Sequence, residues 1–226
     1  QKTAYEISLG LVGSEMCIRD RLSIRSIELP EGSRPVSICY GGGKMWVLDA
    51  GRRSVVAVNP DTRDIEEFHI PEQVGASGLT VNLTGFKPRQ LVWAEGKLWI
   101  AGIGLENTIL LFFDTEGRSW GIIPPPWPWT TVGGWCLAYG DGSIWTLVDV
   151  MRSALLLRVD PATGSVEVVC NGLPGGSSIC YGAGSVWVLY TFVVMTPFGV
   201  VETSRIYRVD VRDRNFTLFT SRSGSS

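Results

Sequence analysis

Few residues in this chain have the types and spacing that catalysis needs. His69 is the single histidine among 226 residues, and an unperturbed imidazole titrates near neutral pH, as a general base must. No Ser, Cys or second His stands beside it. It follows the run EEF and precedes Pro71, so we expect a surface histidine at the end of an outer strand. We assign no catalytic residue.

Two other patterns suggest cation or phosphate chemistry. The acidic residues Asp49, Glu106 and Asp149 follow tryptophan-bearing strands, and carboxylates gathered at one rim suit Ca²⁺ or Mg²⁺. Such sites need several converging ligands, so we expect solvated loop charges, no metal and no other cofactor. The run GGGK at 41–44 lies between two apolar segments rather than before a helix, so we predict a hairpin turn and not a phosphate loop.

The cysteines other than Cys17 are Cys39, Cys136, Cys170 and Cys180. Cys39 and Cys180 hold the same place in two repeats, which a repeating fold keeps apart, so they are poor disulfide partners. No C-x-x-C spacing suggests zinc. We expect small buried thiols, with Cys170 the most exposed of them, and a reducing, cytoplasmic compartment is favoured.

Two aromatic or apolar segments interrupt the repeats and are the predicted contact surfaces. The run PPPWPWTTVGGW cannot pair as an inner strand, because proline fixes φ and lacks an N–H donor. Its tryptophans form either a platform for a ligand or a lid that buries its own rings. The apolar insertion TFVVMTPFGVVETS adds a loop of roughly ten residues to the last repeat and suggests contact with another chain or a missing blade. The predicted contact residues are Trp127, Trp129, Trp135, Phe192, Met195 and Phe198.

Composition excludes several classes of protein. Apolar residues make up 45% and charged residues 19%, so most of the chain is not disordered. Lys and Arg number 20 against 22 Asp and Glu, a net charge of −2. We therefore predict no nucleic-acid partner and no attraction to an anionic membrane. No run of 18 or more apolar residues predicts a membrane span.

Four internal repeats account for most of the chain. Each has an apolar strand, a glycine-containing turn and a strand with an early tryptophan, and these tryptophans are Trp46, Trp99, Trp145 and Trp187. A second hairpin follows each one, and its turn begins with Asn59, Asp114, Asp160 or Asp210. Asn and Asp side chains favour such turns because they accept hydrogen bonds from amides two residues on.

Two hairpins in each repeat predict four strands, and the strand runs are apolar on both faces. Such sheets must be covered on both sides. Units of four strands and roughly 40–50 residues, packed face to face, are the blades of a β-propeller. We predict an all-β propeller of four-stranded antiparallel blades, centred on residues 33–70, 88–123, 132–170 and 175–219.

The repeats also resemble a known family. The segments PVSI, GKMWV and VNPDT in the first repeat, and SIC, GSVWV and RVDPATGSV later in the chain, are similar to blades of streptogramin-lyase-like (virginiamycin B lyase-like), NHL and YVTN propellers. The resemblance covers about residues 26–219. It implies a lyase that opens a lactone by elimination, with a histidine base, a second histidine and magnesium. One histidine cannot supply that pair, so no catalytic residue is carried over.

Residues 1–21 resemble translated sequencing-adaptor DNA. An index primer would encode residues 1–6 and a transposon end residues 11–20, without a mismatch outside the index. We therefore expect natural sequence from Leu22 onward, and a ring of which four blades are visible and whose full size is six to eight blades. A complete four-bladed ring is the alternative.

The sequence favours a binding or scaffold propeller that recognises a small molecule, a glycan, a peptide or another protein chain. The alternative is a fragment of a streptogramin-lyase-like enzyme whose catalytic blades are missing. A purely structural ring segment is a third interpretation. Fold alone does not separate them, because function lies in sites added to a fold.

Overall fold

The computed structural model describes residues 26–76, 78–104, 108–123, 136–150, 153–196 and 199–219. The chain divides into two units, residues 1–31 and 32–226, and the second unit holds all the strands described below. Every regular element of the described residues is a β-strand. Within these ranges, no helix has the length and apolar character needed to cross a membrane.

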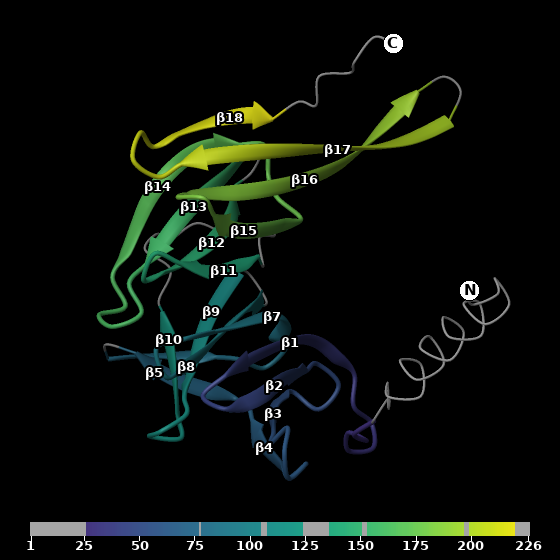
Figure 1. Ribbon diagram of the computed structural model, residues 1–226, viewed down its shortest axis with the longest axis vertical. Coiled ribbons are helices and arrows are strands. Elements are labelled where there is room, and N and C mark those ends of the chain that lie inside the picture. The colour runs from purple at the N-terminus through teal and green to yellow at the C-terminus, as the bar shows by residue number, and fades with distance from the viewer. Residues whose placement is uncertain are drawn as a thin grey trace, which may run out of the picture. The chain divides into compact units, whose positions relative to one another are not determined.

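Four antiparallel sheets of four strands follow one another along the chain (Figure 1). The first has strands β1 (Pro35–Gly41), β2 (Lys44–Asp49), β3 (Ser54–Val58) and β4 (Ile65–His69). The second has β7 (Lys87–Ala94), β8 (Lys97–Ile103), β9 (Thr108–Asp114) and β10 (Ser119–Ile123). The third has β11 (Leu137–Gly140), β12 (Ser143–Val150), β13 (Ser153–Val159) and β14 (Val166–Leu173). The fourth has β15 (Ser178–Gly182), β16 (Ser185–Thr196), β17 (Gly199–Asp210) and β18 (Asn215–Phe219).

Each sheet is a propeller blade, and the four are called blades 1 to 4 in chain order. In every blade the strands pair in the order of the chain. The predicted all-β propeller with four antiparallel blades is therefore confirmed. Between blades 1 and 2, β5 (Gln73–Ala76) and β6 (Leu79–Asn82) form a separate two-stranded sheet.

Three apolar cores lie between successive blades. The core between blades 1 and 2 contains Trp46 and Leu48 from β2 together with Leu98 and Ile100 from β8. Trp99 of blade 2 lies in the core shared with blade 3, and Trp145 of blade 3 lies in the core shared with blade 4. The tryptophans of blades 1 to 3 thus each pack toward the blade that follows. Sheets that are apolar on both faces require this arrangement.

The same type of aromatic contact occurs at two of these interfaces, between blades 1 and 2 and between blades 3 and 4. The indole Nε1 of Trp46 donates to the carbonyl of Gly41 in its own blade at 3.0 Å, and its ring stacks on Trp93 of blade 2, with centroids 6.0 Å apart. Trp145 repeats the arrangement. Its Nε1 donates to the carbonyl of Gly140 at 2.9 Å, and its ring stacks on Tyr181 of blade 4 at 5.8 Å. We call this contact the tryptophan lock.

Glycine is required beside each lock because the incoming ring lies on the backbone. A Cβ at Gly41 would lie 1.9 Å from Cγ of Trp93, and a Cβ at Gly140 would lie 2.1 Å from Cδ1 of Tyr181. No side chain fits within such distances. Gly182 holds the same repeat position in blade 4, where a Cβ would meet nothing within 4 Å.

The apolar insertion of the last repeat forms strands rather than the loop that we expected. β16 and β17 have 12 residues each, and they remain paired from Ser185 with Asp210 to Thr196 with Gly199. Figure 1 shows both strands continuing past β15 and β18. We call the part of this hairpin beyond β15 and β18 the ribbon. Its β-branched residues suit paired strands, which explains the difference from the expectation.

The cysteines also differ from the expectation. Cys170 on β14 is buried, whereas Cys180 on β15 is exposed. Cys39, which holds the same repeat position as Cys180, packs against the core between blades 1 and 2, and burial raises its pKa to about 11. Cys180 is exposed because its face of blade 4 has no blade packed on it among the described residues.

The two equivalent glycines provide a matched test of the lock. We predict that Gly41→Ala lowers the free energy of unfolding by about 1–3 kcal/mol, the usual cost of overpacking a core. Gly182→Ala should change it by less than about 0.5 kcal/mol, as surface substitutions do. Urea unfolding followed by circular dichroism measures both. Equal losses from the two variants would show that the cost comes from the strand and not from the stacked ring.

Candidate functional site

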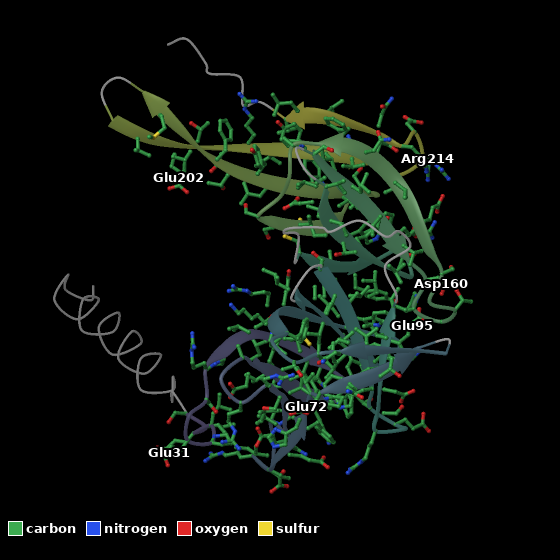
Figure 2. The ribbon with its side chains drawn as sticks, turned by 180° about the vertical axis from the view of Figure 1, so that it is seen from behind. Glu31, Glu72, Glu95, Asp160, Glu202 and Arg214 are labelled. Carbon is green, nitrogen blue, oxygen red and sulfur yellow. The ribbon has the colours of Figure 1, made fainter. Side chains whose placement is uncertain are left out.

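The blades have two ends with different chemistry. One end carries the turns between first and second strands and between third and fourth strands, and we call it the turn rim. The other end carries the β2–β3 connections and their equivalents, and we call it the connection rim. Figure 2 shows Glu95, Asp160 and Arg214 along one side of the molecule and Glu202, on the ribbon, on the other. The ribbon therefore extends from the connection rim.

Of the six predicted contact residues, the structure describes two. Trp127, Trp129, Trp135 and Phe198 lie outside the described residues. Phe192 and Met195 both lie on β16.

Phe192 and Met195 lie on the same ribbon but on opposite faces. Side chains alternate along a strand, so residues three apart point to opposite sides. Phe192 stacks on Tyr190, with centroids 5.2 Å apart, and the guanidinium of Arg205 lies 5.1 Å from its ring. Met195 is 82% exposed. The two do not form one flat ligand platform.

The acidic residues considered for a cation have different environments. Asp49 is buried at the connection rim, and its Oδ1 accepts hydrogen bonds from the amides of Arg34, Gly51 and Arg52 at 2.8–3.1 Å. Burial acts to raise the pKa of Asp49, but the hydrogen bonds from these three amides outweigh it, so the pKa is lowered. This carboxylate organises the loop that follows β2.

Asp149, at the end of β12, has the opposite behaviour. Burial raises its pKa, and its Oδ1 has no hydrogen-bond partner among the described residues. Glu106 lies outside the described residues. In the part of the chain that the structure describes, no three His, Cys, Asp or Glu side chains gather as metal ligands would.

His69 ends β4, the outer strand of blade 1, as its place in the sequence indicated. Its side chain is 65% exposed, and its Nδ1 lies 3.9 Å from Oε1 of Glu67. Glu67 is occupied by Arg52, whose Nε and Nη2 donate to it at 2.8 and 2.9 Å. A carboxylate held by a guanidinium is poorly placed to act on an imidazole as a catalytic partner.

A pocket of about 370 Å³ with both aromatic and charged walls lies at the turn rim between blades 1 and 2. Its floor contains the lock rings Trp46 and Trp93, with Phe68 of β4 beside them. Three turns surround it: the β1–β2 turn at Gly42, the β7–β8 turn at Glu95, and the β9–β10 turn at Glu116. We call it the rim pocket.

The walls of the rim pocket carry charges of both signs. The cations are Lys44, Lys97 and Arg118, and the acids are Glu66, Glu95, Asp114 and Glu116. Arg118 joins the blades through an ion pair with Glu66 at 2.8 Å, and Lys44 lies 3.6 Å from the same carboxylate. The ammonium of Lys44 also lies 5.9 Å from the Trp46 ring, within cation–π range.

Other wall groups are held toward blade 3. Lys97 Nζ donates to the carbonyl of Pro161 at 3.1 Å, and Glu95 accepts from the Tyr139 hydroxyl at 3.3 Å. Burial and the nearby Glu95 raise the pKa of Tyr139, so this phenol stays a donor at neutral pH. The walls are therefore positioned before any ligand arrives.

A second pocket of about 330 Å³ lies at the same rim, on blade 3. It is lined by Ser143, Arg158, Asp160 and Glu167, among others. The Nε of Arg158 donates to Ser143 Oγ at 2.8 Å, and Glu167 pairs with Arg214 of blade 4. It is more polar than the rim pocket and no aromatic ring lines it.

Sequence reasoning did not find the rim pocket, because its residues come from three turns far apart in the chain. The available indication was the acidic and basic residues in equivalent turns, such as Glu95 beside Lys97 and Glu116 beside Arg118. Once four strands are assigned to each repeat, these turns must lie at one end of neighbouring blades.

Comparisons with known proteins support the fold and leave the family open. No protein-family model matches the chain, and no curated protein matches it. One similar structure is a chain of the nidogen/laminin complex, with 8% identity and a TM-score of 0.52 over 87% of this chain and 84% of that one. Another is the extracellular domain of the hybrid two component system BT4673 from B. thetaiotaomicron, with 14% identity and a TM-score of 0.54 over 92% of this chain.

A third similar structure is hydrazine synthase of Kuenenia stuttgartiensis, with 12% identity and a TM-score of 0.50 over 87% of this chain and 69% of that one. This chain spans only a quarter of the length of the BT4673 domain. At such identities the likeness concerns the propeller fold, and the resemblance to streptogramin-lyase-like, NHL and YVTN propellers stays a prediction.

Asp49 and Asp149 should respond to pH in opposite ways. The lowered pKa of Asp49 stabilises the fold above its unfolded value near pH 3.9, and this stabilisation is lost as pH falls through the folded value. Asp49→Asn should therefore lower the free energy of unfolding at pH 7 by about 1 kcal/mol and weaken its loss in acid.

The raised pKa of Asp149 means that the folded protein holds its proton more tightly, so its contribution to stability falls as pH rises. Asp149→Asn should raise the free energy of unfolding at pH 7 and have little effect below pH 3. Thermal unfolding between pH 3 and 8 measures both variants. The same pH dependence in both would contradict the assignment.

Proposed function

We propose that this chain is a binding propeller whose rim pocket holds a segment of a partner polypeptide. The observation that carries the proposal is the rim pocket itself, which combines charges of both signs with aromatic rings. A peptide offers the matching groups, since its side chains bring both charges and apolar surface. Ligand sites of this kind are concave and contain a few fixed polar groups.

The pocket walls favour a polar ligand over an apolar one. Four acids against three cations leave the wall slightly negative, and the Trp46 ring below is buried with Lys44 over it. Glu66 is already paired with Arg118 and Lys44. A basic residue of the partner would therefore meet Glu95, Asp114 or Glu116 before it met an ion pair.

Preorganisation supports binding as the role of the site. Asp114 Oδ1 accepts from the amides of Glu116 and Gly117 at 3.0 and 2.9 Å, and Thr115 Oγ1 donates to the carbonyl of Gly96 at 2.7 Å. The Asp114 bonds organise the β9–β10 turn, and the Thr115 bond ties it to the β7–β8 turn. A site held in place before binding loses less entropy when the ligand arrives.

The predicted contacts at Trp127, Trp129 and Trp135 remain a second part of the proposal. Their proline-rich segment precedes β11 in the sequence, and rigid aromatic side chains suit interfaces. If the combined variant Trp127→Ala and Trp129→Ala leaves affinity for an identified partner unchanged, that part is wrong.

A fragment of a lyase-like enzyme stays the alternative predicted by resemblance. It needs two histidines, and the sequence has one, on the outer strand of blade 1. Similar folds occur in the extracellular domain of a two component system, in a protein complex and in a synthase. Such a spread shows that the fold does not decide between binding and catalysis.

A charge reversal in the pocket wall tests the proposal. An array of random heptapeptides identifies bound sequences, and fluorescence anisotropy gives their affinities. Glu116→Lys should weaken the selected peptides by roughly tenfold or more, because a desolvated charge contact is lost and a like charge replaces it.

Asp61→Lys is the matched control. Asp61 holds the same position in the β3–β4 turn of blade 1, two residues after the turn-leading Asn59, and it does not line the rim pocket. It should leave affinity unchanged. Equal weakening by both variants would indicate a general charge effect, and an array without any basic peptide above background would contradict the proposal.

A further inference from the structure

One face of blade 4 is not covered by any described residue. It carries the same residue types as the face of blade 1 that packs against blade 2. On blade 1 this face carries four residues: Cys39, Gly41, Trp46 and Phe68. Phe68 lies beside Trp46 at 6.1 Å and contacts Phe113 of blade 2 at 4.8 Å. Cys39 pairs across strands with Trp46. Blade 2 covers all of this surface through one apolar core.

The corresponding residues of blade 4 have the same types: Cys180, Gly182, Trp187 and Phe219. Trp187 Nε1 donates to the carbonyl of Gly182 at 3.0 Å, as in a complete tryptophan lock. Cys180 pairs with Trp187 across the strands, and Phe219 lies 5.6 Å from the Trp187 ring. Blade 4 thus holds its half of a tryptophan lock, the Trp187 indole bonded to Gly182, without a stacked partner ring. We call this arrangement the half-lock.

No described residue covers this half-lock. Phe219 is 60% exposed and Cys180 is exposed, whereas Cys39 at the same position has its pKa raised to about 11 by burial. The space above Gly182 is empty to 4 Å, in the place where Trp93 and Tyr181 rest on Gly41 and Gly140. This space above Gly182, which we call the socket, fits one aromatic side chain from the inner strand of another blade.

The complementary half lies on the open face of blade 1. Blade 4 covers blade 3 with Ile179, Tyr181 and Val209, and the residues at the same repeat positions of blade 1 are Ile38, Tyr40 and Val58. All three residue types are identical. Val58 is already buried at 5% exposure, whereas Ile38 is 62% exposed and Tyr40 63% exposed. The open surface is therefore that of the inner strand, where Tyr181 of blade 4 is half-buried.

We propose that a second copy of this chain covers blade 4, with its Tyr40 stacked on Trp187 and lying over Gly182. Each half of the contact has an equivalent in the same molecule. The Trp187 face corresponds to the Trp46 face of blade 1, which packs on blade 2, and Tyr40 corresponds to Tyr181 of blade 4, which packs on blade 3. Since no described residue of the same chain covers either face, a second copy supplies the missing half of each. The contact is head-to-tail, and two copies close it into a ring of eight blades, within the known range.

Charges at the turn rim do not oppose this contact. Arg118 pairs with Glu66 between blades 1 and 2, and Arg214 pairs with Glu167 between blades 3 and 4. At the proposed contact the same positions hold Arg63 and Thr217, both exposed. The arginine meets a hydroxyl instead of a carboxylate, so the aromatic lock carries the association.

Sedimentation of the full chain over a range of concentrations tests the proposal, together with alkylation of Cys180 followed by peptide mass mapping. We expect a species of twice the chain mass and at least tenfold slower alkylation of Cys180 as it forms, since the lock covers this thiol. Trp187→Ala and Tyr40→Ala should each raise the dissociation constant more than about tenfold, as loss of a central aromatic does.

A mixture of the two variants distinguishes head-to-tail contact from other dimers. Mixed chains keep one intact pair, Trp187 of one copy with Tyr40 of the other, so the mixture should associate more tightly than either variant alone. Gly182→Val should block association by filling the socket while leaving the melting temperature of the single chain unchanged.

Leu218→Ala is the control, since Leu218 neighbours Phe219 but pairs with Tyr207 on the opposite face of blade 4. It should associate as the unaltered chain does. Three results would overturn the proposal: a single-chain mass at every concentration with Cys180 reactive, a single-chain mass with Cys180 protected, which would indicate closure within one chain, or association that Tyr40→Ala does not weaken.

Discussion

Stacking of an indole ring against the inner strand of the next blade is the contact on which this structure depends. A four-stranded sheet with apolar residues on both faces has no stability of its own in water, and each blade gains it from its neighbours. Trp46, Trp99 and Trp145 are 0–3% exposed. A ring of this size buries more apolar surface than any other side chain, so the spacing of the tryptophans sets where each blade must lie.

The interface between blades 2 and 3 shows that the space around the tryptophan must be filled, but that different residues can fill it. Among the described residues, no ring from blade 3 stacks on Trp99, and Phe112 of its own blade lies 5.3 Å away instead. Gly121 makes room for that ring, since a Cβ there would lie 2.0 Å from Phe112 Cζ. Gln90 adds two hydrogen bonds to the backbone of Leu137, through Nε2 at 3.1 Å and Oε1 at 2.8 Å. At this interface, the packing of Phe112 on Trp99 within blade 2 and the hydrogen bonds from Gln90 to Leu137 take the place of the tryptophan lock.

The repeats made the blades predictable, because a tryptophan and a turn-leading Asn or Asp mark each hairpin pair. The turn assignments are confirmed by hydrogen bonds from backbone amides to Asn59, Asp114, Asp160 and Asp210. The ribbon was not predicted, since the segment around Pro197 and Gly199 interrupts the pattern although the strands on either side pair in register. The rim pocket and the exposure of Cys180 depend on which blade faces which, and a single sequence without neighbouring structure does not contain that information.

The repetition of the segment SICYG in β1 and β15 has a consequence for folding. Tyr40 pairs with Met45 and Ile38 with Val47, while Tyr181 pairs with Val186 and Ile179 with Val188, so either inner strand fits either second strand. A chain that emerges with two interchangeable strands can pair the wrong ones before the blades are complete, and repeat proteins misassemble in this way. Local hairpin closure across the short turns at Gly43 and Gly184 forms much faster than pairing across the chain. Because the tight glycine turns let each hairpin form first, each inner strand pairs with the second strand of its own blade.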